Sequence, residues 1–434
     1  MSRRDNSRVI FANMVNELMV AVAPPAHAKA LTEVSPRKLW LAQEGDVVVT
    51  PRPIDEPFKR YACAILGIDP DEVVTLSPAG ELTETLAHAL RRRGMVDRLR
   101  AFIAERPNIE FLAFALDSPT LELVEDLGVP LHGYRSLPNR ALREMIYQLN
   151  TKSGFRRAAE NLGLRIVPGA YCEGLDALAS TVEQMLGVTG GVIVKYDRSS
   201  NGYGHIIFRR EEVAGRNLCD YLAERTAAFP EQPHIFTIEA LMPFDSVPSV
   251  EMVIDDAGAR LLYLCDQRCP NGAFAGIVTP PLNLAPKVTR ELLRVGELFG
   301  DYVHGLGFRE VCDVDAGVTV DGTLYVTETN FRRTGGTYLD ALMRRLIGDD
   351  YLDTHVWWAD ARVGGIEQDF CAGWSAIEAA GLAFDSAAGE GVILTADSLR
   401  IDGKWRYLII APTAQLAADM EAKLEKVLQL PKGV

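Results

Sequence analysis

The stretch that decides the fold runs from Gly307 to Gly336 and reads GFREVCDVDAGVTVDGTLYVTETNFRRTGG. Its first half, Val311 to Val320, has β-branched residues at short intervals and stops at Asp321-Gly322, a dipeptide that favours a tight turn. The second half, Thr323 to Asn330, resumes as a strand. The pattern therefore predicts an antiparallel hairpin.

Residue types that bind metals lie at matching positions of this hairpin. Side chains of one strand parity point to one face of a sheet, so Asp315 on the first strand and Glu328 and Asn330 on the second can converge. Two carboxylates and an amide suit Mg²⁺, which takes oxygen ligands together with water and substrate phosphates. Arg332 and Arg333 follow directly and would hold an anion. Taken alone, the same residues also fit a surface hairpin with solvated acidic side chains.

The composition of the chain excludes several classes of protein. Its 434 residues suffice for about two or three domains with cores of their own. Seven cysteines at irregular positions, with no secretory signal peptide at the N-terminus, indicate a reducing cytoplasm without a disulfide framework. No apolar run is long enough to cross a bilayer, and a net charge of −14 argues against nucleic acid as a partner. We therefore expect a cytoplasmic protein without membrane or nucleic-acid partners.

The N-terminal part alternates strands with helices. Such alternation predicts a parallel sheet flanked by helices, so residues 1–140 are expected to form one open α/β domain. No G-x-G-x-x-G follows the first strand, which argues against a dinucleotide site. The expected strands are 8–15, 46–50, 72–76 and 109–115, and the expected helices are 58–66, 81–104 and 119–127.

The segment after residue 140 carries two lysines and a glycine-rich loop. One helix is expected from Leu142 to Gly163, with Lys152 inside it. A strand at 191–196 delivers Lys195, and the loop RSSNGYG follows at 198–204. Small residues let backbone N–H groups approach a phosphate chain, and Lys195 would supply the charge behind them. The other interpretation of this loop is a plain hairpin turn at Asn201-Gly202.

The remaining segments are predicted in less detail. Residues 235–242 form an apolar strand that could wall an adenine slot, with Glu239 as the acceptor for the ribose hydroxyls. The last part of the chain is expected to be a loose connector and a small α+β unit or appendage. The other expected elements are strands at 249–254, 260–265, 390–395 and 405–410, an ordered loop at 276–284, and helices at 285–306, 338–347 and 413–430.

In this order and spacing, the motifs resemble the ATP-grasp ligases. The resemblance rests on Lys152, on Lys195 with RSSNGYG, on the strand IEALMP, and on Asp315 thirteen residues before Glu328 with Asn330 behind it. It covers about residues 141–348 and implies a lid subdomain at about 165–237 and a central antiparallel-sheet subdomain. Residues 1–140 resemble a pre-ATP-grasp domain, and residues 349–434 would be the connector and the small C-terminal α+β unit.

A closer resemblance is to peptide ligases related to the pheganomycin enzyme. It is carried by NTKSGFRRAAENLGLRIVPG and EGVILTADSLRIDGKW. Many ligases of the superfamily place an arginine shortly before the first metal carboxylate, where this chain has Asp313, so Arg309 or Arg333 would take that duty. The site residues that the resemblance implies are, for ATP, Lys152, Lys195, Ser200, Asn201, Gly202, Gly204, Glu239 and Leu241; for the metal, Asp315, Glu328 and Asn330; and for catalysis, Arg332, Arg309 and Lys195.

The resemblance implies an ADP-forming ligase that uses ATP as co-substrate and Mg²⁺. A substrate carboxylate would attack the γ-phosphate to give an acylphosphate, and an amine would then displace phosphate to form an amide. Amino acids or short peptides of specialised metabolism are the expected carboxylate and amine substrates. The alternatives are a ligase that uses ammonia or a non-amino-acid amine, a non-catalytic ATP-binding regulator or scaffold, and a kinase.

Two features remain open at this level. Glu251 is either a general base or part of a structural ion pair within the sheet. The tryptophans at 357, 358 and 374 are either interface residues of a homodimer or core residues.

Overall fold

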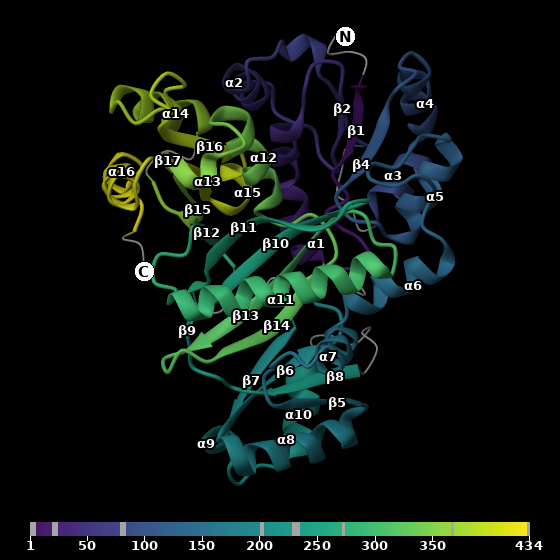
Figure 1. Cartoon of the computed structure of the whole chain (residues 1–434), viewed down its shortest axis with the longest axis vertical. Coiled ribbons are helices and arrows are strands. Elements are labelled where there is room, and N and C mark those ends of the chain that lie inside the picture. Colours follow the sequence, from purple (N-terminus) through teal and green to yellow (C-terminus); the bar gives the residue numbers. More distant parts are fainter. Residues whose placement is uncertain are drawn as a thin grey trace.

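The computed structural model describes residues 6–19, 25–78, 84–199, 204–227, 235–270, 274–365 and 369–431. Their strands form three sheets of four, nine and four strands, which we call the N-terminal, central and small sheets. The N-terminal and small sheets lie at opposite ends of the molecule, and the central sheet with the long helix α11, Pro286–Gly305, lies between them (Figure 1). Among the described residues, no helix has the length and apolar character that crossing a membrane requires.

The N-terminal sheet is parallel, as predicted. Its strand order is β3-β2-β1-β4, formed by Val74–Leu76, Val47–Val49, Arg8–Phe11 and Glu110–Ala113. The helix expected at 81–104 is two helices, because the chain turns at Gly94 in the left-handed region. The helical segments here are α1 Pro25–Glu33, the short 3-10 helices η2 Ser35–Leu41 and η3 Pro70–Glu72, α2 Glu56–Leu66, α3 Leu86–Arg92, α4 Val96–Ala104 and α5 Ser118–Leu127.

A second helix break separates the N-terminal part from the small sheet. The sequence predicts one helix from Leu142 to Gly163, but the structure has α6 at Arg140–Leu149 and α7 at Lys152–Asn161. Thr151 between them is extended, and its hydroxyl accepts a hydrogen bond from the Gly154 backbone N–H at 3.0 Å. This N-cap starts a new helix and puts Lys152 in the first turn of α7.

The small sheet is antiparallel, with strand order β5-β8-β6-β7. Its core is an apolar cluster that includes Val182 of α8, Val192 of β6 and Ile238 of β8. The strands are Gly169–Glu173, Ile235–Ala240, Gly191–Tyr196 and His205–Arg209, and the helices are α8 Leu175–Thr189, α9 Arg210–Val213 and α10 Leu218–Thr226.

The central sheet has the strand order β14-β13-β10-β11-β12-β15-β17-β16, and β9 also pairs with β13. The hairpin of β13 and β14 confirms the opening prediction. The strands are β9 Phe244–Ser246, β10 Pro248–Asp255, β11 Gly258–Arg268, β12 Gly276–Thr279, β13 Val311–Thr319, β14 Leu324–Asn330, β15 Val356–Val363, β16 Gly391–Ala396 and β17 Lys404–Ala411. The other helices are α12 Thr337–Leu346, α13 Tyr351–Thr354, α14 Phe370–Ala379, α15 Leu399–Asp402 and α16 Ala414–Val427.

The strands of the predicted C-terminal α+β unit extend the central sheet, and the predicted connector contains strand β15. The expected loop at 276–284 begins with strand β12, which pairs with β15 through Val278 and Trp358. Trp357 is fully buried, and its ring lies 5.4 Å from that of Tyr263 in β11. Trp357 and Trp358 are therefore core residues, and Trp374 is half-buried on α14.

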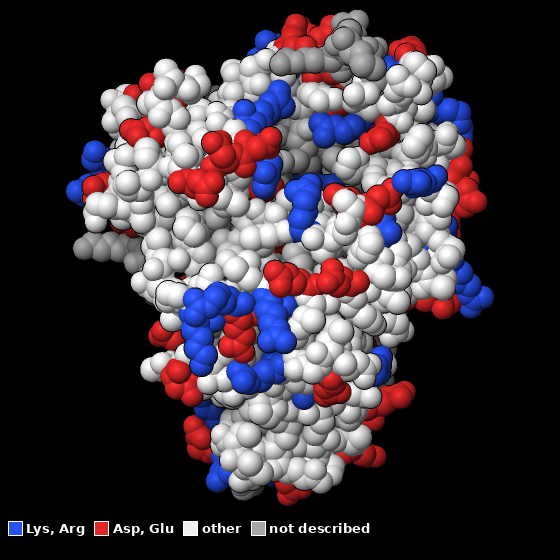
Figure 2. All heavy atoms as spheres, viewed as in Figure 1, with Lys and Arg blue, Asp and Glu red and all other residues white. Residues whose placement is uncertain are grey.

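Helix α11 packs closely on β10 and β11 because two of its residues are glycines. A Cβ on Gly300 would lie 2.5 Å from the Cβ of Ala259, and a Cβ on Gly296 would lie 3.0 Å from a methyl group of Val250. Leu292 and Phe299 of the same helix are fully buried in the core below it. On the outside of the molecule, acidic and basic side chains are mixed, and a group of Lys and Arg side chains lies over α11 (Figures 1 and 2).

Candidate active site

The largest cavity described here has a volume of about 650 Å³ and lies where the three sheets approach one another. Residues from distant parts of the chain line it. Its lining includes Met14, Arg37 and Phe114 from the N-terminal part; Lys195, His205, Glu239 and Leu241 from the small sheet and its exit; Glu251, Gln267, Asp313, Asp315, Glu328, Asn330 and Arg332 from the central sheet and its hairpin; and Arg406 from β17.

The hairpin brings the three predicted metal ligands together. Asp315 pairs with Glu328 across the two strands, and Asp313 pairs with Asn330. The Asn330 side-chain amide donates to Asp313 Oδ1 at 2.8 Å and to Asp315 Oδ2 at 3.3 Å, and Gln267 Nε2 donates to Asp315 Oδ1 at 2.7 Å. Burial, together with the nearby Glu328 carboxylate, raises the pKa of Asp315 to about 7.

This donor set fits a magnesium ion that completes its ligands from a substrate. The described residues contain no group of three or more His, Cys, Asp or Glu side chains arranged for a metal. Mg²⁺ does not need one, since it is commonly held by one or two carboxylates together with water and substrate phosphates. Asp315 and Glu328 are such a pair, and a bound cation would reduce the repulsion between their carboxylates, which adds to the effect of burial on the pKa of Asp315.

Lys152 lies against this pair. Its Nζ is 2.7 Å from Glu328 Oε2 and donates to the Ser199 carbonyl oxygen at 3.1 Å, and its side chain is 5% exposed. Burial alone would raise the pKa of Glu328, but the positive charges of Lys152 and Lys195 together hold the pKa below its usual value. A backbone contact fixes the helix start, because the Lys152 N–H donates to the Asp197 carbonyl at 2.8 Å.

Lys195 and Glu239 form a second buried ion pair, on the small sheet. Lys195 Nζ lies 2.6 Å from Glu239 Oε2, and Arg156 Nη1 lies 3.6 Å from Glu239 Oε1. Both partners line the cavity, and so does Leu241, which follows β8. Gly204 starts the next strand in the left-handed region and contacts Tyr196. Ser200, Asn201 and Gly202 lie outside the described residues.

His205 is a site residue that sequence reasoning missed. It lies opposite Lys195 across β6 and β7 and lines the cavity. Burial, together with the charges of Lys195 and Lys152, lowers its pKa to about 3, so the imidazole is neutral near pH 7. Its Nε2 has no hydrogen-bond partner within the described part of the chain. The signal for it was the hairpin register, which puts residue 205 beside residue 195.

The arginines of the candidate site differ in position. Arg332 lines the cavity, and its Nη2 donates to Asn330 Oδ1 at 2.5 Å. Arg309 is 3.2 Å from Asp256 and donates to backbone carbonyls next to it, and it does not line the cavity. Contrary to the sequence-based expectation, Arg309 lies outside the site. Arg333 is buried in an ion pair of 2.7 Å with Glu310.

Glu251 is enclosed by hydroxyl groups. It accepts hydrogen bonds from Tyr263, Thr334 and Thr337. Burial raises its pKa above the usual value. The expectation of an ion pair at Glu251 is not met, since each of these partners is a hydroxyl group. The three hydroxyls fix the carboxylate, which makes it a structural anchor at the wall of the cavity.

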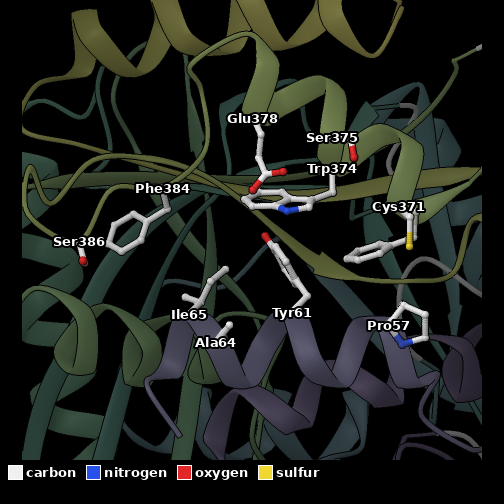
Figure 3. Close-up of a pocket in the computed structure, with 11 residues that line it drawn as sticks. Pro57, Tyr61, Ala64, Ile65, Cys371, Trp374, Ser375, Glu378, Phe384 and Ser386 are labelled. Carbon is white, nitrogen blue, oxygen red and sulfur yellow. The ribbon is translucent and has the colours of Figure 1, made fainter.

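A second pocket, of about 440 Å³, lies between α2 and α14 (Figure 3). Tyr61 and Ile65 rise from α2 toward Trp374 and Glu378 of α14. The Tyr61 and Trp374 rings lie 4.5 Å apart. Among the described residues that line it, Glu378 is the one charged side chain, so these residues offer no cation for a phosphate. The larger cavity is therefore the candidate active site.

Two family models match the chain. Residues 35–129 match the pre ATP-grasp domain, and residues 375–424 match the PGM1 C-terminal domain. The first match runs from η2 to α5 and includes β2, β3 and β4 of the parallel N-terminal sheet. The second begins in α14 and ends in α16.

Two curated relatives are ligases. A butirosin acyl-carrier protein L-glutamate ligase of Niallia circulans is 27% identical over 198 residues, which are 44% of this chain and 45% of the relative. An L-propargylglycine L-glutamate ligase of Streptantibioticus cattleyicolor is 24% identical over 297 residues, which are 63% of this chain and 59% of the relative. The alignments thus span only about half the length of these relatives.

Solved structures share the fold over almost the entire chain. An ADP complex of the N5-carboxyaminoimidazole ribonucleotide synthetase purK has a TM-score of 0.60 at 13% identity, with 98% of both chains covered. A nucleotide complex of biotin carboxylase from Campylobacter jejuni has a TM-score of 0.61 at 13% identity, with 98% of this chain and 92% of the other covered. The chain therefore has the fold of these ATP-grasp enzymes, with a match to the pre ATP-grasp domain near its N-terminus.

Proposed function

We propose that the chain is an ATP-dependent carboxylate-amine ligase that forms an amide or peptide bond and releases ADP and phosphate. One observation carries the proposal. Lys195 lines the same cavity as the carboxylates Asp315 and Glu328, and a second buried lysine from another element, Lys152, lies 2.7 Å from Glu328. Cations for phosphates beside a carboxylate pair for a metal are the parts that phosphoryl transfer requires.

In the proposed reaction, an oxygen of the substrate carboxylate attacks the γ-phosphorus of ATP, and the bond to the β,γ-bridging oxygen breaks to release ADP. The nitrogen of an amine then attacks the acylphosphate carbonyl, the C–O bond to phosphate breaks, and the amine loses a proton. Lys152, Lys195 and Arg332 bind and orient the phosphates, and their positive charges stabilise the negative charge of the transferring group. Mg²⁺, held by Asp315 and Glu328 with Asn330 beside them, would neutralise phosphate charge.

His205 and Glu239 support this arrangement. Glu239 holds Lys195 in place and is our candidate for the ribose hydroxyls, next to Leu241 at the proposed adenine slot. The neutral His205 can donate a hydrogen bond to a phosphate oxygen without adding charge. Gly204 and the neighbouring Ser200, Asn201 and Gly202 remain candidates for backbone contacts to the phosphates.

The proposed substrates are amino acids or short peptides of specialised metabolism. Both curated relatives are named as ligases of L-glutamate, and the names of their other substrates belong to antibiotic and amino-acid biosynthesis. L-Glutamate is therefore the first compound to test on either side of the bond. We also propose a cytoplasmic location, since all seven cysteines are free.

The experiment is a measurement of ADP and free phosphate with amino acids and short peptides offered singly and in pairs, with mass spectrometry of the products. A condensed product with one ADP and one phosphate per bond would support the ligase. Phosphate that stays on the substrate would indicate a kinase, and a product formed only with ammonia or a simple amine would indicate the other class of ligase. Tight ATP binding without turnover for any pair would favour a non-catalytic ATP-binding protein.

A further inference from the structure

Two cationic side chains near the N-terminal side of the cavity, Arg37 and Lys38, have no role in the mechanism above. Lys38 lies on η2, packed against α12, and is only 2% exposed. Within the described residues its Nζ has no hydrogen-bond partner. The Nζ lies 4.4 Å from the ring centroid of Phe114 and 5.5 Å from that of Tyr338. These ring contacts offset only part of the cost of burying an ammonium group.

Two guanidinium groups share the same rings. Arg37 Cζ lies 5.3 Å from the ring centroid of Tyr338, and Arg332 Cζ lies 5.7 Å from that of Phe114. Arg37, Arg332 and Phe114 line the cavity, and Lys38 is next to this wall because its ammonium group contacts the Phe114 ring. Among the described side chains, Arg37 Nε also has no hydrogen-bond partner. Three cations thus converge at one end of the cavity.

The carboxylates near this cluster are engaged elsewhere. Glu251 accepts from three hydroxyl groups, Glu310 is paired with Arg333 at 2.7 Å, and Asp402 is paired with Arg406 at 2.5 Å. Burial lowers the pKa of Lys38 well below its usual value, and the charges of Arg37 and Arg333 lower it further. Arg332 is faced by Asp313, Asp315 and Glu328, whereas Arg37 and Lys38 have no ion-pair partner among the described side chains. An anion from outside the chain would supply that partner.

The wall beside the cluster limits the kind of anion. Leu31 and Val34 precede Arg37 on the chain, and both line the cavity together with Met14. An apolar wall next to a cationic end suits a carboxylate on a short aliphatic body. A polyphosphate, by contrast, needs cations along its whole length, which Lys152 and Lys195 offer on the other side of the cavity.

We propose that Arg37 and Lys38 bind a carboxylate that the reaction leaves intact, so that one substrate of the ligase is an amino acid or peptide with such a free carboxylate. This inference rests on the proposed function and names the substrate class of the same cavity. Arg332 lies between the bound carboxylate and the hairpin, which would put the reacting group of that substrate toward the phosphates.

Contacts to two other parts of the chain fix the position of η2, the short helix that carries Arg37 and Lys38. Trp40 Nε1 donates to the Thr395 carbonyl of β16 at 2.9 Å. Arg345 of α12 donates to the carbonyl of Ala42, just after η2, at 2.6 Å. Arg37 and Lys38 are therefore positioned by contacts of the N-terminal part with α12 and with β16.

The test is the binding of L-glutamate to the full chain, measured by isothermal titration calorimetry with Mg²⁺ and a non-hydrolysable ATP analogue. L-Glutamine and L-isoglutamine each lack one of its two carboxylates. The unaltered protein should bind one of these amides about tenfold to a hundredfold more weakly than L-glutamate, and the weaker amide identifies the carboxylate that Arg37 and Lys38 hold. Lys38→Met, which keeps the volume and removes the charge, should weaken L-glutamate binding by a similar factor and abolish the preference.

Arg37→Gln is the second variant, because Arg37 is half-buried and can be replaced even if Lys38→Met fails to fold. Arg140→Gln is the control, since the Arg140 side chain is 93% exposed on α6. The proposal is wrong if L-glutamate does not bind the unaltered protein, or if Arg37→Gln binds L-glutamate and both amides as tightly as the unaltered protein does. Calorimetry requires no turnover, so failure of the product screen would refute the ligase without deciding this binding site.

Discussion

Lys195 is held in place before any phosphate arrives, because Glu239 lies 2.6 Å from its ammonium group. We expect Lys195→Met to lower kcat/KM for ATP by about a hundredfold to a thousandfold, the range seen when one charge-stabilising group is lost. The unfolding temperature should change little, since Arg156 remains 3.6 Å from Glu239. Phosphate release and a thermal melt measure the two effects. A Lys195→Met protein with full activity would contradict the phosphate role.

Asp315 gives a prediction in which activity and stability move in opposite directions. Its buried carboxylate lies beside those of Glu328 and Asp313, and the repulsion costs stability. Asp315→Asn should therefore raise the unfolding temperature while it lowers phosphate release by about a hundredfold or more. Asp321→Asn, at the exposed turn of the same hairpin, is the matched control and should leave activity unchanged. Lower stability in Asp315→Asn would argue against this reading of the site.

Asp117, which lies outside the candidate active site, should make the stability of the protein depend on pH. Burial raises its pKa to about 6, and its Oδ2 has no hydrogen-bond partner among the described residues. The folded-state pKa is above the unfolded one, so this residue's contribution to stability is greatest below about pH 4 and is lost as the pH rises through about 6. Asp117→Asn should raise the free energy of unfolding by about 1–3 kcal/mol at pH 8 and by little at pH 4. Denaturant titrations at both pH values would show it, and an equal effect at both would contradict it.

At the scale of an element, α11 depends on glycine for its distance from the sheet. Gly300→Ala should lower the free energy of unfolding by about 1–3 kcal/mol, because the added Cβ would meet Ala259 at 2.5 Å. Gly305→Ala is the control on the same helix, since no atom lies within 4 Å of its added Cβ. That control should be neutral or gain up to about 1 kcal/mol from helix propensity. Equal effects of the two variants in denaturant titrations would show that the close contact does not matter.

The elements that could be predicted from the sequence are those with a local signal. The hairpin of β13 and β14 was predicted because β-branched residues flank Asp321-Gly322, and its register followed from strand parity. The break between α6 and α7 was missed because one N-cap residue, Thr151, interrupts an otherwise helical pattern. Strand β12 was missed because its four residues have meaning only beside β15.

At the scale of the whole molecule, the continuous central sheet makes the C-terminal strands part of the fold. A chain cut after residue 388 would lose β16, β17 and α16 and would expose the edge of β15 with Trp357. We expect this truncated chain to aggregate and to lose its cooperative thermal transition, as measured by size-exclusion chromatography and calorimetry. A soluble truncated protein with an unchanged transition would show that the last strands are dispensable.

Sequence analysis could predict only those residues of the candidate site that lie together in one motif. Asp315, Glu328 and Asn330 lie on one hairpin, and their convergence followed from the sequence. The proximity of Arg37 and Lys38 to Arg332 depends on the packing of η2 against α12, which no local pattern reports. The misplacement of Arg309 has the same cause, because only tertiary structure shows that Asp256 holds it.

The hydrogen bond from Trp40 to Thr395 has a consequence for how such chains diversify. The short helix that carries Arg37 and Lys38 lies near the start of the chain, yet one of its anchors is a strand more than 350 residues later. Recombination that exchanged only the N-terminal domain between two homologues would transfer Arg37 and Lys38 without β16, the strand that contacts their helix. Chimeras with a new substrate preference should therefore need both ends from one parent, and the two ends should be inherited as a unit.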